Sequence, residues 1–163
     1  MAATIDVIKT YGTTGTPTEV VVTSPGLLST NDNAAPSSSP VVVPMAGTNY
    51  SYECWLRFKC TVAPATQVTN FKIWSDGAAV ATGVVITVNT DAVTTFATPV
   101  VTDSTQGTRD DFANHGSGAK INVAGTLVNV GDKSDFSVFQ LEVGTTASPG
   151  NISETVTFQY DET

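Results

Sequence analysis

Residues 49–62 alternate between apolar and polar side chains along their whole length. The apolar residues occupy the even positions: Tyr50, Tyr52, Cys54, Leu56, Phe58, Cys60 and Val62. Successive side chains of a β-strand point to opposite faces, so a period of two predicts one long strand with one core face. The odd positions are polar except for Trp55. We therefore expect a central strand whose even side chains form the core.

Weaker alternation recurs along the rest of the chain, separated by turn-forming residues about every ten positions. Further strands are expected over residues 4–10, 18–23, 68–75, 84–90, 94–101, 120–130, 134–143 and 152–160. The one plausible helical turn spans residues 109–114 and ends before Gly116. This pattern is typical of an all-β antiparallel sandwich or a closed barrel. We favour a sandwich of immunoglobulin-like or jelly-roll type, with strands 49–62 and 68–75 forming a hairpin in one sheet.

Residues 24–44 interrupt the strand pattern and are rich in Pro and Ser, most of all in the run Ala-Ala-Pro-Ser-Ser-Ser-Pro at 34–40. Such a composition favours extended backbone. It is either a long surface loop or a flexible connection that lets residues 1–23 act as an extended N-terminal arm. The sequence thus suggests two units: residues 1–44 with the N-terminal strands and connection, and residues 45–163 as the sandwich, able to fold alone.

The net charge of −8 and the pI of about 4.3 restrict the classes of partner. A phosphate backbone requires a basic surface, so nucleic acid is excluded as the main ligand and an anionic membrane is disfavoured. Charged residues make up only 13% of the chain, which suits a protein covered by partners. No apolar run is long enough for a transmembrane helix, and the N-terminus lacks the basic start and apolar core of a signal peptide.

Cys54 and Cys60 lie six residues apart on the same predicted strand. At about 3.3 Å per residue their Cα atoms would be roughly 20 Å apart, whereas a disulfide requires less than about 7 Å. We therefore expect two buried, reduced thiols rather than a disulfide or a metal site.

No pattern of catalytic or metal-binding residues stands out. His115 is the only histidine; Asp110 and Asp111 are near it, but no Gly-x-Ser-x-Gly nucleophile motif is present, so a solvated loop histidine is expected. Asp110 and Asp111, with Asp103, are the best candidates for a cation, but solvated turn carboxylates are expected instead. Residues 116–120 lack the ending of a phosphate-binding loop. The sequence predicts no catalytic residue, cofactor or metal, and hence a non-enzymatic protein.

The two tryptophans suggest a binding surface. Strand alternation points Trp55 and Trp74 away from the core, together with three of the seven basic residues, Arg57, Lys59 and Lys72. If the two strands are neighbours, all five side chains share one outer sheet face, and tryptophan beside basic charge is typical of interfaces. The alternative is that another segment of the chain, such as the N-terminal arm, folds over this face.

Several stretches resemble small structural proteins of tailed bacteriophages. They are Asn-Phe-Lys-Ile-Trp-Ser-Asp-Gly at 70–77, Phe-Gln-Leu-Glu-Val at 139–143, Ala-Ser-Pro-Gly-Asn-Ile-Ser-Glu-Thr at 147–155 and Phe-Gln-Tyr-Asp-Glu at 158–162. The resemblance implies a β-sandwich component of the virion, made in the bacterial host cytoplasm and assembled as a homo-oligomer. The protein is most similar to a capsid decoration (cement) protein, which binds the major capsid protein at the capsid surface and stabilises the head.

Two other functions remain open at this point. The chain could instead serve as a tail, neck or fibre module of the virion. A carbohydrate-binding sandwich is a further alternative, in which Trp55 and Trp74 would stack on sugar rings.

Overall fold

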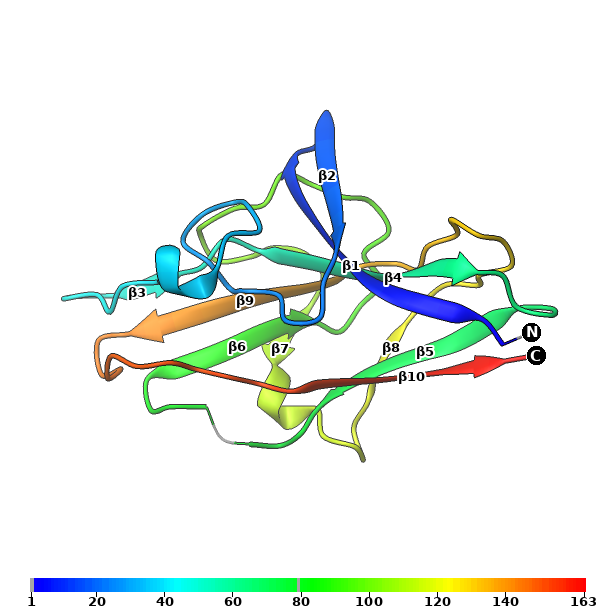
Figure 1. Ribbon diagram of the computed structural model, residues 1–163. Helices are drawn as coiled ribbons and strands as arrows, with labels where there is room; N and C mark the ends of the chain where they lie inside the picture. Colours follow the sequence, from blue (N-terminus) through cyan, green and yellow to red (C-terminus); the bar gives the residue numbers. More distant parts are fainter. Residues whose placement is uncertain (1, 79) are drawn as a thin grey trace.

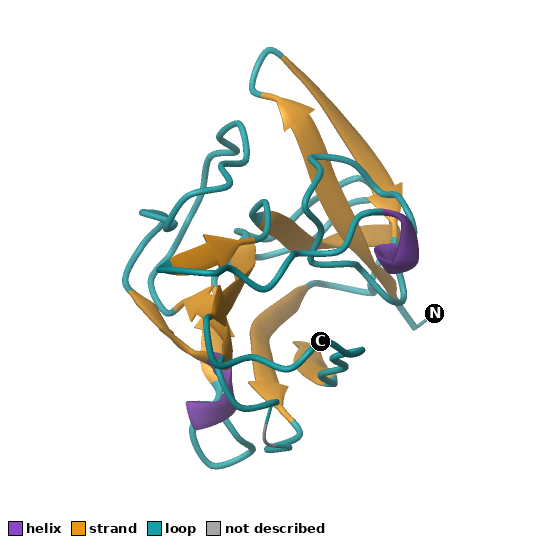
Figure 2. Ribbon diagram, turned by 90° about the vertical axis from the view of Figure 1, so that its left-hand side faces the viewer, coloured by secondary structure: helices purple, strands orange, loops and turns teal. Residues whose placement is uncertain are grey.

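The computed structural model describes residues 2–78 and 80–163 and has an all-β fold of two packed antiparallel sheets, which confirms the predicted β-sandwich (Figures 1 and 2). The large sheet has the strand order β2-β1-β4-β9-β6-β7, and β3 also pairs with β9. Its strands are β1 (Thr4–Thr13), β2 (Thr16–Val21), β3 (Thr48–Tyr50), β4 (Cys54–Val62), β6 (Val84–Asn89), β7 (Arg109–Asp111) and β9 (Ser137–Gly144). The small sheet has the order β10-β5-β8, with β5 (Val68–Ser75), β8 (Ile121–Val123) and β10 (Val156–Glu162). Two 3₁₀ turns, η1 (Pro36–Ser38) and η2 (Phe112–Asn114), complete the described structure.

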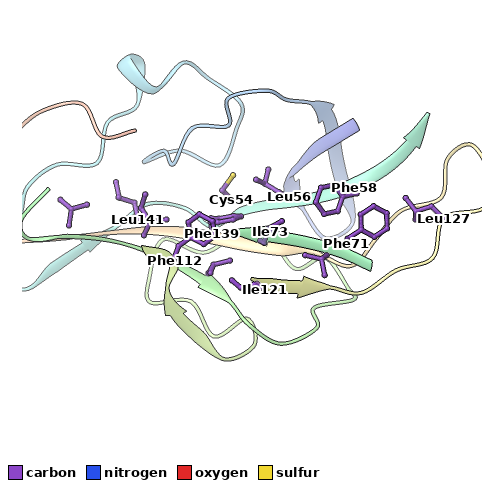
Figure 3. Packing of buried hydrophobic residues seen from close by; sticks show 14 of the residues in the cluster. Cys54, Leu56, Phe58, Phe71, Ile73, Phe112, Ile121, Leu127, Phe139 and Leu141 are labelled. Carbon is purple, nitrogen blue, oxygen red and sulfur yellow. The ribbon is translucent and has the colours of Figure 1, made fainter. Parts of the chain in front are cut away.

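The core lies between the two sheets, and β4 supplies its centre (Figure 3). The even side chains of β4 are buried there: Cys54, Leu56, Phe58 and Cys60. The Phe58 ring stacks on Phe71 of β5, with ring centroids 4.9 Å apart. The predicted alternation is therefore correct from Cys54 to Cys60, and in β5 for Phe71 and Ile73, which are also buried in this cluster. It changes phase at Asn70, which has a φ of 56°, so Val68 is buried in the same cluster.

The expected single strand over residues 49–62 is interrupted. Tyr50 pairs with Glu142 of β9, whereas Cys54 pairs with Phe139, so β9 has one residue fewer than the opposite chain over this interval. This extra residue is a bulge between β3 and β4, and it reverses which face the side chains point to. Tyr50 and Tyr52 are consequently half-buried and lie outside the core cluster, contrary to the prediction.

The strands β4 and β5 do not form the expected hairpin. β4 pairs with β1 and β9 in the large sheet, whereas β5 pairs with β8 and β10 in the small sheet. The connection between them crosses from one sheet to the other. Residues 94–101 were expected to form a strand, but within the described chain they are irregular and follow an isolated bridge at Val93. The predicted helical turn at 109–114 divides into β7 and η2.

β1 is an internal strand of the large sheet rather than a separable arm. It pairs with β4 from Thr4 to Thr10, and Ile8 and Thr10 are buried. Only the far end of the β1–β2 hairpin projects beyond the body of the sandwich (Figure 1). No structural boundary follows residue 44 in the described chain, because the N-terminal strands complete the sheet that residues 45–163 begin.

The Pro- and Ser-rich segment 24–44 is a surface loop attached to the sandwich. The Leu28 side chain is buried, and its carbonyl accepts a hydrogen bond of 2.8 Å from the Tyr52 amide. The buried Lys9 Nζ donates to the carbonyl oxygens of Gly26 and Asp32, at 3.4 and 2.7 Å. These contacts support the surface-loop interpretation over the flexible connection.

Cys54 and Cys60 are both buried and unbonded, as predicted. Burial raises the pKa of the Cys54 thiol to about 11, so the thiol stays protonated and unreactive at neutral pH. Among the described residues, no helix has the length and apolarity that crossing a membrane requires.

We expect Phe58→Ala to lower the free energy of unfolding by about 3–5 kcal/mol, because it removes a buried ring between the sheets. Phe158→Ala is the matched control, since Phe158 is 43% exposed although its ring also contacts Phe58, with centroids 5.6 Å apart. Urea denaturation followed by tryptophan fluorescence measures both. Equal losses would contradict the placement of Phe58 at the centre of the core.

We expect a chain beginning at Met45 to lack a cooperative fold, because it would expose the edge of β4 that pairs with β1. Circular dichroism during heating, together with proton NMR dispersion, measures this. A sharp melting transition in the truncated chain would instead show that β1 is dispensable.

Candidate partner-binding surface

The five residues expected to share a binding face lie on opposite sides of the molecule. Trp55, Arg57 and Lys59 point outward from the large sheet, because they alternate with the core residues of β4. Lys72 and Trp74 point outward from the small sheet for the same reason. The prediction that all five side chains share one face is therefore wrong, because β4 and β5 belong to different sheets.

Trp55 is fully buried although it points away from the main core. The rings of Phe96 and Phe136 meet it edge-on, each with a centroid distance of 5.2 Å. Val93 and Val138 complete this second apolar cluster. The alternative of a covering segment is thus correct for Trp55, but the cover is the loop around residues 93–97 rather than an N-terminal arm.

A buried carboxylate fastens this cover to the large sheet. Glu53 is 3% exposed and accepts hydrogen bonds from Trp55 Nε1 at 3.1 Å and from Ser104 Oγ at 2.5 Å. The backbone amide of Val100 also donates to Glu53, at 3.3 Å. Buried charges require such partners. The sequence offered no signal for this role, because Glu53 occupies a polar position of the alternation and was expected to face solvent.

Arg57 is engaged within the fold rather than free for a partner. Its guanidinium forms an ion pair with Glu19 of β2 and lies 4.3 Å from the centre of the Phe136 ring. Lys133 Nζ also pairs with Glu19, at 2.7 Å. Burial of Glu19 raises its pKa, but hydrogen bonds and charge interactions from Lys133 and Arg57 outweigh it, so the pKa is lowered overall. These contacts hold Glu19 of β2 against Arg57 of β4 and against Lys133 on the outer face of the large sheet.

The outer face of the small sheet, here called the small-sheet face, consists of polar side chains around one tryptophan. Register places Trp74 beside Thr157 of β10, and Lys72 between Gln159 and Asn122. Lys120 precedes β8, and its Nζ lies 4.2 Å from the centre of the Trp74 ring. The members of the small-sheet face are Lys72, Trp74, Lys120, Asn122, Thr157 and Gln159.

The Lys120 ammonium is held in place over the tryptophan. Its Nζ donates to Gln159 Oε1 at 2.9 Å while it contacts the Trp74 ring. A cation over an indole face is stabilised by the ring quadrupole, and the contact also restricts the ring. The face therefore presents a partly ordered aromatic ring and a fixed positive charge.

The small-sheet face concentrates the positive charge that the fold does not use. Four of the seven basic side chains are engaged internally: Arg57 and Lys133 share Glu19, and Lys9 and Arg109 donate to backbone carbonyls. The remaining three are Lys59, Lys72 and Lys120. Two of these, Lys72 and Lys120, lie on the small-sheet face, and neither forms an ion pair among the described residues. Asp161 of β10 lies further along the same side of the sheet, where it accepts a hydrogen bond of 2.8 Å from Asn70. On a protein of net charge −8, the two lysines make a local basic surface.

His115 is packed into its loop rather than solvated as expected. Its Nε2 lies 3.0 Å from an Asp110 carboxylate oxygen, its Nδ1 lies 3.0 Å from the Ala119 carbonyl, and its side chain is 16% exposed. Hydrogen bonds from Asn114, the Asp111 amide and His115 lower the pKa of Asp110. Both ring nitrogens thus face structural partners, so the ring has no free nitrogen to act as a base.

Two of the acidic residues considered as cation ligands, Asp110 and Asp111, instead accept hydrogen bonds from nearby backbone amides. Asp111 accepts a hydrogen bond of 3.0 Å from the Ala113 amide and caps η2. In the part of the chain that the structure describes, no three His, Cys, Asp or Glu side chains come together as metal ligands, so Asp103, Asp110 and Asp111 do not form such a group.

No protein-family model, curated protein or solved structure matches this chain. Its function is therefore inferred from its own sequence and surfaces.

We expect the two tryptophans to behave oppositely on substitution. Trp55→Ala should lower the free energy of unfolding by about 3–5 kcal/mol, because it empties a fully buried site. Trp74→Ala should cost far less, since Trp74 is only half-buried on an uncovered face. Iodide quenching of the single-tryptophan variants Trp55→Phe and Trp74→Phe gives a second measurement. Equal quenching of both tryptophans would contradict the burial of Trp55.

Proposed function

We propose that this protein is a non-enzymatic structural component of a tailed-bacteriophage virion, namely a capsid decoration protein that binds the major capsid protein through the small-sheet face. The observation that carries the proposal is the pair of lysines around Trp74 on a protein that is otherwise strongly acidic. Lys72 and Lys120 have no carboxylate partner among the described residues, although the chain carries 15 acidic residues. An uncovered face of this kind suits an acidic protein surface.

The sequence resemblance supports the same surface. The stretches 70–77 and 158–162, which resemble phage structural proteins, are separated by 80 residues of chain but include the paired strands β5 and β10. Phe158 pairs with Ile73 and Gln159 pairs with Lys72. The resembling residues thus include Lys72, Trp74 and Gln159, three of the six members of the small-sheet face, whereas the stretch at 139–143 lies in β9 of the large sheet.

The chemistry of the face fits protein binding better than sugar stacking. A sugar ring requires an open aromatic face, but one face of Trp74 already holds the Lys120 ammonium. Trp55, the second tryptophan of the carbohydrate alternative, is buried. A carboxylate-bearing surface can instead contact Lys72 and Lys120 directly while the indole edge is buried, and tryptophan is enriched among residues that dominate binding energy.

The proposal includes assembly on the capsid surface after synthesis in the bacterial cytoplasm. Stabilisation of the head would follow from mass action, because a protein that binds only the assembled shell favours that state. A tail, neck or fibre position is the runner-up, and the site of attachment on the particle separates these.

The test is binding of the purified protein to phage heads assembled without it. The double variant Lys72→Glu and Lys120→Glu should weaken binding by about tenfold or more, which corresponds to about 1.4 kcal/mol or more. Wild-type binding should also weaken as salt rises. Lys59→Glu is the matched control, because it reverses one charge on the opposite outer face. Co-sedimentation and electron microscopy of the heads measure occupancy and position.

Full occupancy by the double variant would contradict the role of the small-sheet face. Attachment of the wild-type protein to tails rather than heads would contradict the decoration function while retaining a virion role. Melting curves of each variant show whether the fold is intact.

A further inference from the structure

The strand β3 has one edge that no other described strand occupies. β3 pairs only with β9, from Thr48 opposite Gly144 to Tyr50 opposite Glu142. The next residue, Ser51, donates its amide to the Leu141 carbonyl at 2.9 Å, so its amide faces β9. In an antiparallel ladder the backbone groups of alternate residues face the same neighbour. The amides and carbonyls of Thr48 and Tyr50 therefore point away from β9, along the unoccupied edge.

The loop at 27–29 covers the same edge only a little further along. The amide of Tyr52 has the same parity as Thr48 and Tyr50, and it donates to the Leu28 carbonyl at 2.8 Å. The edge is thus paired at Tyr52 and open at Tyr50 and Thr48. Thr48 is exposed and Tyr50 half-buried, so the open part is reachable from solvent.

This open edge lies in a groove with apolar walls. Its lining residues are Ser29, Pro40, Val41, Val42, Thr48, Asn49, Tyr50, Val101 and Thr102. Val41 and Val43 pack against the main core, so the 40–43 wall lies on the core side of the sheet. The Val100 amide donates to Glu53, so the 100–102 wall lies on the outer side. Val42 and Val101 are nevertheless 68% and 44% exposed, and they are open to a ligand.

The outer side of the groove is acidic. Glu142 is directly opposite Tyr50 on β9, and Asp103 follows the outer wall. Burial raises the pKa of Tyr50, and the negative charges of Asp103 and Glu142 raise it further. Arg109 is the cation that interacts with both carboxylates, so the two negative charges are partly offset. A strand lying here would direct alternate side chains to the apolar core-side wall and to this acidic side.

We propose that the open edge of β3 is a strand-addition site for an extended segment of another protein whose side chains alternate between apolar and basic. The segment pairs through the backbone groups of Thr48 and Tyr50. Its apolar side chains contact Val42 on one wall, and its basic side chains lie on the outer side with Tyr50, where Asp103 follows the outer wall. Strand addition derives affinity from main-chain hydrogen bonds and specificity from alternate side chains. The site is separate from the small-sheet face and does not rest on the proposed function.

A second copy of this chain fits the groove less well. Two β3 edges are each recessed between walls, and a two-fold contact would bring the Asp103 and Glu142 carboxylates of both copies together. The acidic C-terminal strand β10, with Asp161 and Glu162, would also be repelled. Charge complementarity thus favours a basic-apolar segment from a different protein.

The test uses two capped peptides with the same valines, Ac-Val-Lys-Val-Lys-Val-NH2 and Ac-Val-Glu-Val-Glu-Val-NH2, titrated into the full chain. In the free protein, NMR hydrogen exchange should be fast at the amides of Thr48 and Tyr50 and slow at Asn49, whose amide faces β9. The lysine peptide should slow exchange at Thr48 and Tyr50 by about tenfold or more, and the glutamate peptide should bind at least about tenfold more weakly.

Substitutions separate the edge from the fold. Thr48→Pro removes an amide that points into the groove, and proline is tolerated where a strand amide faces solvent, so the fold should remain and peptide binding should be lost. Asn49→Pro is the matched control, because it removes an amide that faces β9 and should lower the melting temperature. Val42→Ser keeps the backbone and the charge but removes an apolar contact from the core-side wall, where the valines should lie, so it should also weaken binding of the lysine peptide.

The proposal is overturned if the lysine peptide gives no protection at Thr48 and Tyr50, or if the two peptides bind equally. It is also overturned if these amides become protected with rising protein concentration alone, since a second copy would then be the occupant. The double variant Lys72→Glu and Lys120→Glu should bind the peptide normally, which distinguishes failure of this site from failure of the small-sheet face.

Discussion

Burial of the core face of β4, and of Trp55 on its other face, is the constraint on which the rest of the structure depends. Its even side chains pack against the small sheet, where Phe58 stacks on Phe71. On the opposite face Trp55 is enclosed by Phe96 and Phe136. A strand buried on both faces needs three layers around it, so the fold requires the loop at 90–108 as a cover in addition to the two sheets. β1 and β9 then protect its two edges.

The covering loop at 90–108 brings polar groups into the interior of the protein. Hydrogen bonds between these groups and the large sheet fix the position of the loop. Glu53 binds the Trp55 indole, Ser104 and the Val100 amide. Nearby, Arg109 donates to the Val138 carbonyl and to Thr87, while its buried Nε has no hydrogen-bond partner among the described residues. Burial lowers the pKa of Arg109 to about 10. Because unpaired buried polar groups are costly, this network specifies one loop conformation more strictly than apolar packing alone.

The use of charge divides the surface into regions with different chemistry. On the outer face of the large sheet, Glu19 forms ion pairs with both Arg57 and Lys133. The positive charge of these two side chains is therefore partly neutralised within the molecule. The small sheet has three strands, no described loop covers its outer face, and Lys72 and Lys120 there form no ion pair among the described residues. The groove at β3 has the opposite sign because Asp103 and Glu142 lie beside it. The two proposed sites therefore select partners of opposite charge.

The sequence by itself determined the local facts that follow from a period of two. Alternation identified most of the strands, placed Phe58, Phe71 and Ile73 in the core, and kept Cys54 apart from Cys60, because side-chain direction along a strand is a local property. The same alternation correctly directed Trp55 and Trp74 away from that core.

Only the tertiary structure decided which strands are neighbours and which outward side chains stay exposed. Trp55 and Trp74 have the same pattern, yet the chain crosses between sheets after β4, and one tryptophan is covered while the other is not. The bulge at 51–53, the open edge of β3 and the partners of Glu53 likewise depend on residues 47 to 96 positions away. Alternation along one strand contains no information about such contacts, because it repeats every two residues whatever lies beside the strand.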